Sequence, residues 1–167
     1  MAKNAIYRVK MRRRREGKTD YRKRLALLKS GMPRAVVRKT NTRIIVQFVE
    51  YNVDGDKVLV TVTSDILKKY GWNGSFKSIP AAYLAGYLAG KKALEKGIDE
   101  AVLDIGRHVA AKGGRLFAAL KGIVDAGVYV PHGDDIFPDE DRLSGKHIGE
   151  DVEKMFNEVK QKLEVSS

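Results

Sequence analysis

The stretch Arg12 to Leu25, with the sequence RRRREGKTDYRKRL, contains eight cationic and two acidic side chains in fourteen residues. A hydrophobic core cannot hold charge at that density, because an ion without a partner is costly to remove from water. The stretch must therefore lie at the surface or outside the folded body. We predict that Met1 to Thr19, which has no sustained apolar period, is an extended arm in the absence of its partner.

The charge is separated along the chain. The whole chain has a net charge of +11, but residues 1–43 alone carry +14, residues 44–167 carry −3, and residues 131–167 carry −5. A basic arm joined to a near-neutral body and an acidic tail is typical of proteins that bind nucleic acid. We therefore expect an arm at residues 1–20, a folded body at residues 21–132, and an acidic tail with a helix at residues 133–167.

Composition excludes several other classes of protein. The chain has no cysteine, so it has neither a disulfide framework nor thiolate chemistry, and a reducing cytosol is permitted. The basic N-terminus lacks the apolar segment of a secretory signal. No apolar run approaches the roughly 20 residues that a membrane helix needs, so no membrane partner is expected. A length of 167 residues suits one domain with a real core.

The first part of the body is predicted to contain a helix and a three-strand meander. The helix runs from Tyr21 to Lys29 and is capped by Thr19 or Asp20. Its expected core residues are Leu25, Leu28 and Tyr21, and its expected outward residues are Arg22 and Arg24. Three strands rich in β-branched residues follow at residues 34–40, 43–52 and 58–64. Turns join them at residues 40–42 and 54–57, where Asn41 and an Asp-Gly pair tolerate positive φ.

The second part changes to a helical period. A helix is predicted at residues 79–97, with Pro80 in its first turn and Gly97 at its end. Its small residues Ala85, Gly86, Ala89 and Gly90 would let it lie close on the sheet. A buried parallel strand at residues 100–106, a helix at 114–127 and a last strand from Val128, stopped by Pro131, complete the body. In the tail, residues 147–165 form an amphipathic helix whose apolar face comprises Val152, Met155, Phe156, Val159 and Leu163.

This order of elements predicts an α/β fold. The antiparallel meander followed by βαβ crossovers gives a mixed sheet with helices on both faces.

Several segments of the sequence resemble one known family. They are the run from Arg12 to Leu25, RKTNTRIIVQF from residue 38, KYGWNGSFKSIPAAYLAGYLAGKKAL from residue 69, and LDIG followed by GGRLFAALKGIVDAGVYVPHG from residues 103 and 113. In this order they are similar to the universal L-eighteen family of large-subunit ribosomal proteins in its archaeal form. The eukaryotic counterpart is large-subunit protein L-five. The resemblance covers about residues 5–150.

The resemblance implies a fold, a role and partners. The implied fold is RNase-H-like, and the implied role is that of a non-catalytic structural constituent of the large subunit in the cytoplasmic ribosome. The implied partners are 5S rRNA, 23S rRNA and neighbouring large-subunit proteins, with 5S rRNA bound in the central protuberance. No cofactor is implied. The RNA-contacting surface would be the arm with the nearby sheet edge and loops.

The arm and the first helix supply most of the candidate RNA-binding residues. Arginine presents forked donors that grip phosphate oxygens and a plane that stacks on bases. Tyrosines placed among cations can stack on unpaired bases. The candidates here are Tyr7, Arg8, Lys10, Arg12, Arg13, Arg14, Arg15, Lys18, Tyr21, Arg22 and Arg24.

Two other segments add candidates. The turn between the first two strands gives Arg34, Arg38, Lys39, Thr40, Asn41 and Arg43, whose mixture of cations and short polar groups suits phosphates, 2′-hydroxyls and base edges. The resemblance implies that Arg38 to Asn41 and Arg43 lie at the 5S rRNA surface. The glycine-rich loop IGRHVAAKGGR gives Arg107, His108, Lys112 and Arg115, which would touch backbone phosphates.

Other functions were weighed against RNA binding. The arm alone also fits a solvated tail or a localisation signal. GKTD at Gly17 is not a phosphate-binding loop, because the motif needs glycine where Arg12 stands. An RNA chaperone or accessory factor outside the ribosome has a similar charge, but it should not co-sediment with large subunits in high salt.

A metal-dependent nuclease would need clustered carboxylates. Its candidates are Asp65, Asp104, Asp125, Asp134 and Asp135. The first strand contains no acid, and the three histidines, His108, His132 and His147, have no ligand spacing. Neither a catalytic nor a metal site is therefore expected.

Overall fold

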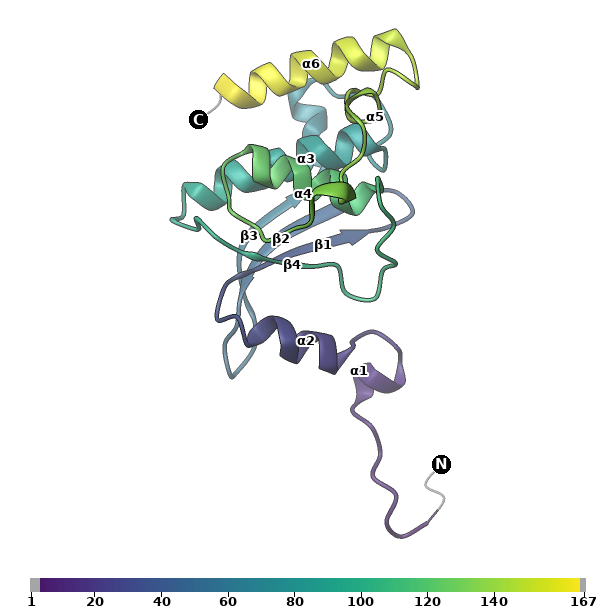
Figure 1. The fold of residues 1–167 in the computed structure, drawn as a ribbon, viewed down its shortest axis with the longest axis vertical. Helices are drawn as coiled ribbons and strands as arrows, with labels where there is room; N and C mark the ends of the chain where they lie inside the picture. The colour runs from purple at the N-terminus through teal and green to yellow at the C-terminus, as the bar shows by residue number, and fades with distance from the viewer. Residues whose placement is uncertain (1–3, 166–167) are drawn as a thin grey trace.

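The structure, a computed structural model, describes residues 4–165, so residues 1–3 of the predicted arm and 166–167 of the predicted tail lie outside it. Its α-helices are α1 (Arg12–Arg15), α2 (Tyr21–Leu28), α3 (Ile79–Leu94), α4 (Arg115–Asp125), α5 (Glu140–Ser144) and α6 (Glu150–Val165). Two short 3-10 helices, η1 (Ser64–Tyr70) and η2 (Asp134–Ile136), lie between them. The arm projects from one end of the molecule and α6 lies at the other (Figure 1).

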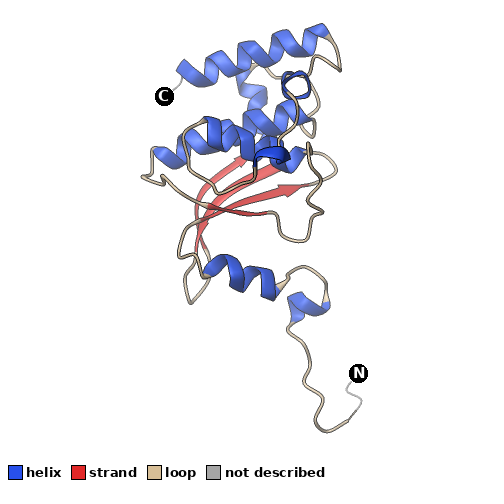
Figure 2. Ribbon diagram, viewed as in Figure 1, coloured by secondary structure: helices blue, strands red, loops and turns tan. Residues whose placement is uncertain are grey.

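The sheet has four strands in the order β3-β2-β1-β4. The strands are β1 (Arg34–Lys39), β2 (Ile44–Glu50), β3 (Lys57–Thr63) and β4 (Val102–Asp104). The first three form the predicted antiparallel meander, and β4 pairs with β1 in parallel. Figure 2 shows the sheet between α3 and α4 on one side and α2 on the other. The mixed α/β fold class is confirmed.

The two faces of the sheet differ in chemistry. Because side chains alternate along a strand, Ala35 and Val37 point to one face of β1 while Arg34, Val36 and Arg38 point to the other. The first face packs under α3 and α4 and is fully buried, together with Val46 and Phe48 of β2 among others. The second face looks toward α2 and carries charged groups. The main apolar core therefore lies on the side away from the arm, and Val36 and Val49 are the buried apolar residues on the second face of β1 and β2 in the described residues.

Glycines set the distance between α3 and α4. A Cβ added to Gly86 of α3 would lie 2.1 Å from the Ala119 carbonyl oxygen, and one added to Gly122 of α4 would lie 2.1 Å from the Tyr83 carbonyl oxygen. The two helix backbones are thus in direct contact. We predicted that the small residues of α3 let it approach the sheet. For Gly86 and Gly90 that was wrong, since both face α4.

The tail packs on the body through the predicted face of α6. Phe156, Val159 and Leu163 are buried, while Val152 and Met155 are half-buried against the same core. Lysines of the body and the tail fix the far end of α6. Lys91 Nζ donates to the carbonyl oxygens of Leu163 and Glu164 at 2.8 and 2.9 Å, and Lys162 Nζ donates to the Tyr70 carbonyl oxygen at 3.2 Å. The apolar face of the tail helix is therefore covered by this chain itself.

Three predictions about the arm and α2 were wrong. The chain is not extended throughout residues 4–19, because Arg12–Arg15 form the short helix α1. In α2, Leu25 is 57% exposed rather than in the core, and Arg24 points inward to an ion pair. The backbone N–H groups of Arg14 and Arg15 donate to the Met11 carbonyl oxygen, and that of Glu16 donates to the Arg12 carbonyl oxygen. The arginine run thereby closes a helical turn on its own. The Asp20 cap of α2 is confirmed.

The predicted last strand is reduced to a single bridge. Tyr129 pairs in parallel with Glu100, through Ala101 N–H to the Tyr129 carbonyl and Tyr129 N–H to the Asp99 carbonyl. The pairing cannot extend past Pro131, which has no backbone N–H to donate. Val128 and Val130 are nevertheless buried, so the segment contributes to the core as predicted. None of the helices in residues 4–165 has both the length and the hydrophobicity to cross a bilayer.

We expect Gly86→Ala to destabilise the body by roughly 2–3 kcal/mol, because the added methyl overlaps the Ala119 carbonyl and the helices must separate. Urea unfolding followed by circular dichroism measures this. The matched control is Gly133→Ala, at φ −89° and ψ 157°, where an added Cβ meets nothing within 4 Å. Equal unfolding midpoints for the two variants would show that the α3–α4 contact is looser than described.

Candidate nucleic-acid interface

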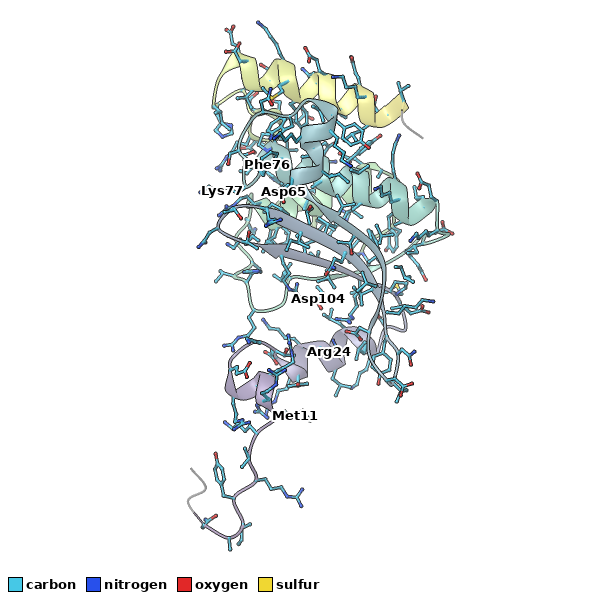
Figure 3. All side chains as sticks on the ribbon, turned by 180° about the vertical axis from the view of Figure 1, so that it is seen from behind. Met11, Arg24, Asp65, Phe76, Lys77 and Asp104 are labelled. Atoms are coloured by element: carbon cyan, nitrogen blue, oxygen red, sulfur yellow. The ribbon has the colours of Figure 1, made fainter. Side chains whose placement is uncertain are left out.

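A chain of ion pairs joins α2 to the second face of the sheet. Arg24 of α2 donates to both oxygens of Asp56, at 2.7 and 2.9 Å. Arg34 donates to Asp56 Oδ2 at 2.5 Å and to Asp104 Oδ2 at 2.9 Å. Arg38 donates to Asp104 Oδ1 at 2.9 Å. These five residues are the ion-pair chain, and Figure 3 shows Arg24 on α2 and Asp104 at the end of β4 within the region between α2 and the sheet.

The two carboxylates of the ion-pair chain, Asp56 and Asp104, remain ionised because arginines surround them. Burial by itself raises the pKa of the Asp104 carboxyl, but Arg38, the Gly106 N–H at 2.8 Å and Arg34 together bring that pKa below its ordinary value. Hydrogen bonds from Arg24, and next from Arg34, outweigh burial and lower the pKa of Asp56. Two carboxylates thus hold three guanidinium groups.

The ion-pair chain contains three of the predicted RNA-binding arginines, Arg24, Arg34 and Arg38, which are paired with carboxylates inside the protein. Arg34 is 3% exposed and lies between the two carboxylates, so its guanidinium is an internal group of the fold. The side chains of Arg24 and Arg38 are 29% and 34% exposed and are paired as well. The Nε of Arg34 is buried without a hydrogen-bond partner within the described residues. A cleft of about 730 Å³, lined by both charged and apolar side chains, lies between α2 and the sheet at this group.

A second cleft lies in the arm itself. It has a volume of about 660 Å³ and we call it the arm cleft. It is lined by Tyr7, Lys10, Arg14, Arg15, Thr19, Asp20, Tyr21, Arg22 and Arg107. All but Thr19 and Asp20 were predicted RNA-binding residues. The structure therefore brings together two aromatic rings and five cations from the arm, α2 and the loop after β4.

The turn before α2 is fixed to the body through Arg107. Its Nη1 donates to the Gly17 carbonyl oxygen at 2.5 Å. Gly17 has φ +66°, and a Cβ there would lie 2.8 Å from the same Nη1, so the site suits glycine on both counts. Within the turn, Arg13 Nε donates to Thr19 Oγ1 at 2.8 Å. The arm is thus ordered against the body from α1 onward.

Three other cations of the arm, Arg8, Arg12 and Lys18, do not line the arm cleft. Arg12 and Lys18 form exposed ion pairs with Glu16 at 3.4 and 2.9 Å. Arg8 is exposed on the projecting segment that precedes α1. Exposed pairs of this kind contribute little to stability, so these cations remain accessible to an external anion.

The turn between β1 and β2 is built by Thr40 rather than by Asn41. Thr40 Oγ1 accepts from the N–H groups of Thr42 and Arg43 at 3.3 and 2.9 Å, and the Thr40 N–H donates to the Arg43 carbonyl at 2.9 Å. Asn41, named from the sequence as a residue that tolerates positive φ, does not adopt it, since every described residue with positive φ is a glycine. The Asn41 side chain is exposed at the tip, and Arg43 pairs with Asp65 at 2.5 Å.

The loop after β4 lies beside the end of β1. Burial lowers the pKa of His108, and the positive charges of Lys39 and Arg38 lower it further. Lys112 is exposed, and Arg115 donates to the Lys77 carbonyl oxygen at 3.2 Å. The loop therefore contacts the end of β1 through Arg38, which donates to the Asp104 carbonyl oxygen, and the arm through Arg107, which donates to the Gly17 carbonyl oxygen.

The carboxylates considered for a nuclease serve other interactions. Asp104 binds Arg34 and Arg38, Asp65 binds Arg43, and Asp125 accepts from the Tyr83 hydroxyl at 2.9 Å and from Lys121. The side chain of Asp134 lies outside the description. Within the part of the chain that is described, no three histidines or acids gather as a metal site would require.

Sequence reasoning missed two residues that shape this interface. The sequence predicted Asp56 in a turn and Asp104 in the strand at residues 100–106, yet each binds two arginines. The pairs span 32, 22, 70 and 66 positions along the chain. A possible signal was the arginine at the start of a strand that otherwise reads as buried, because a buried cation requires carboxylates nearby.

Comparison with known proteins gives consistent matches. The sequence model of a family described as ribosomal large subunit proteins 60S L5 and 50S L18 matches residues 5–100 and 97–133. Similar proteins include three archaeal ones, each called large ribosomal subunit protein uL18. The Methanoculleus marisnigri protein is 58% identical over 150 residues, which is 90% of this chain and 86% of the relative. That of Korarchaeum cryptofilum is 57% identical over 158 residues (95% and 81%), and that of Aeropyrum pernix 50% over 159 residues (95% and 74%).

We expect Asp104→Asn to cost roughly 2–3 kcal/mol at neutral pH, because Arg34 and Arg38 lose a carboxylate at a buried position. The folded-state pKa of Asp104 is lowered, so its contribution is complete above the ordinary value of 3.8 and is lost as the pH falls through the lowered value. The stability difference between wild type and variant should therefore shrink in acid.

Urea unfolding at pH 7 and at pH 3 measures this difference. Asp54→Asn is the control, since Asp54 makes no ion pair within residues 4–165. A difference that is the same at both pH values would mean that Asp104 does not act through its charge.

Proposed function

The chain belongs to the family of ribosomal large subunit proteins 60S L5 and 50S L18, and we propose that it binds 5S rRNA through its arm and the loops beside it. In the same proposal it helps to attach 5S rRNA to 23S rRNA in the central protuberance. Membership of the family makes the chain a structural protein of the large subunit of the cytoplasmic ribosome and not an enzyme. Its partners are rRNA and other ribosomal proteins.

The arm cleft is the observation that carries the proposal. Arg14, Arg15 and Arg22 line it and make no ion pair within residues 4–165, so their forked donors are open to phosphate oxygens. Tyr7 and Tyr21 line the same cleft and offer ring faces to unpaired bases. Folded RNA with exposed loops presents both groups at short spacing, whereas a regular duplex hides its bases. The cleft therefore suits a structured RNA such as 5S rRNA.

The neighbouring loops extend this surface. We include the exposed Asn41 at the β1–β2 turn, together with Lys39, Thr40 and Arg43, and we include His108, Lys112 and Arg115 of the loop after β4. Arg34 stands apart, because its buried guanidinium supports the surface from inside. The order β3-β2-β1-β4, with the Tyr129 segment beside β4, supports an RNase-H-like description of the body.

The end of the molecule opposite to the arm suits a different set of neighbours. The exposed side of α6 and the segment before it are acidic, so they repel RNA and leave 23S rRNA contacts to the basic end. We propose that this acidic end faces neighbouring large-subunit proteins.

Deleting residues 1–18 should leave a folded domain, because none of residues 4–18 is buried in the core. Affinity for 5S rRNA should fall, and the plot of log affinity against log salt should become shallower by roughly 4 if about five phosphate contacts are lost. Filter binding at several salt concentrations measures both. A truncated protein with the affinity and salt slope of the full chain would remove the arm from the interface.

Replacing Arg12 to Arg15 by lysine separates charge from geometry. The charge is unchanged, so the salt slope should stay similar, while affinity should fall because lysine offers neither a bidentate fork nor a planar group. Circular dichroism of the variant serves as the folding control. Unchanged affinity would mean that the arm acts through charge alone.

A further inference from the structure

Asp56 lies beside α2, whose first residues line the proposed RNA-binding cleft, although its charge repels RNA. It sits at the β2–β3 turn just before β3, with its side chain 25% exposed, and it binds one arginine of α2 and one of β1. We propose that Asp56 is a positioning residue that holds α2, and with it the arm cleft, at a fixed place on the sheet before RNA arrives. This proposal rests on the proposed function in one respect, which is that the RNA bound at the arm cleft is 5S rRNA.

Little else holds α2 in place. None of its residues is buried, and Leu25 is 57% exposed. Leu27 and Leu28 are only half-buried, and the cleft of about 730 Å³ separates much of the helix from the sheet. Apolar packing is therefore incomplete under α2. The bidentate bond from Arg24 to Asp56, with both contacts below 3 Å, is a charged, directional interaction between the helix and the turn before β3.

The position of Asp56 is itself fixed by the body. Arg34 donates to Asp56 Oδ2 at 2.5 Å, and Arg34 is anchored by Asp104 at 2.9 Å on its other side. The Asp56 carboxylate that binds α2 is thus held in place by Arg34 and, through Arg34, by Asp104. Removing the charge at position 56 leaves Arg34 paired with Asp104, so the body should still fold.

Holding α2 also holds the arm cleft. Tyr21 and Arg22 of α2 form one wall of that cleft, and Arg107 of the body forms another. Arg107 fixes the Gly17 turn from one side while Asp56 fixes α2 from the other. A binding site that is already in place avoids the cost of ordering its parts on binding. Asp56 would therefore raise RNA affinity without touching RNA.

The first test needs no RNA. Arg24→Gln removes the α2 side of the bond and leaves Arg34 with both carboxylates. Hydrogen exchange of the α2 backbone amides should become about fivefold faster, as expected for loss of a partly exposed ion pair. Arg22→Gln, on the same helix and without an ion pair in the described residues, is the matched control and should not change exchange. Equal exchange in both variants and wild type would overturn the proposal.

The second test uses the sign of the effect on 5S rRNA affinity. Asp56→Asn and Asp54→Asn each remove one negative charge from the same turn. If Asp56 were merely a nearby charge, both variants would bind RNA more tightly. Positioning predicts the opposite for position 56: affinity should fall about threefold to tenfold with an unchanged salt slope, because the same contacts form after an added ordering step.

Further outcomes keep the two proposals apart. Asp56→Glu keeps the carboxylate and should restore part of the affinity, whereas a purely steric role of Asp56 would be kept in Asp56→Asn, which has the shape of aspartate, and disturbed in the longer Asp56→Glu. Urea unfolding of each variant checks that the body is intact. If wild-type protein failed to bind 5S rRNA, the proposed function would fail while the exchange experiment would still decide the role of Asp56. If wild type bound and Asp56→Asn bound as well or better, the positioning role would be wrong.

Discussion

Arg34 carries a permanent charge on an inner strand of the sheet with only 3% of its surface exposed, and a charge in that position is stable only among carboxylates. The two carboxylates come from the turn before β3 and from the end of β4. Each of them also binds a second arginine, on α2 or farther along β1. The carboxylates that one buried cation requires thereby fix α2, the β2–β3 turn and the start of the loop after β4 relative to one another.

This arrangement is possible because the apolar core uses only one face of the sheet. Gly86 and Gly122 bring α3 and α4 into backbone contact, so these two helices cover that face as one layer. The tail helix α6 then covers the outer side of α3 with its own apolar face. All large apolar surfaces are satisfied on that side. The opposite face is left free to hold charges, and the arm enters there.

The sequence predicted the elements far better than the contacts between them. Periodicity located α3, α4, α6 and the meander, since apolar spacing reflects which side of a local element is buried. The last strand failed because a ladder depends on a partner and on Pro131, and Leu25 of α2 was misplaced because its helix is held by an ion pair. The residues of the arm cleft were predicted from composition, but Asp56 was not. Its partners lie 22 and 32 residues away, and no local pattern reports such a pairing.

The acids within the basic end pair with some of its cations and leave others open to phosphate. A run as dense as Arg12 to Leu25 repels itself, and a free chain would relieve that repulsion by extending. Glu16 pairs with Arg12 and Lys18, Asp20 caps α2, and Asp56 holds Arg24. These few carboxylates neutralise enough charge for α1 and α2 to fold against the body. They leave Arg14, Arg15 and Arg22 of the arm cleft without an ion pair in residues 4–165, so most groups that hold the structure and the groups open to phosphate are different residues of one short stretch.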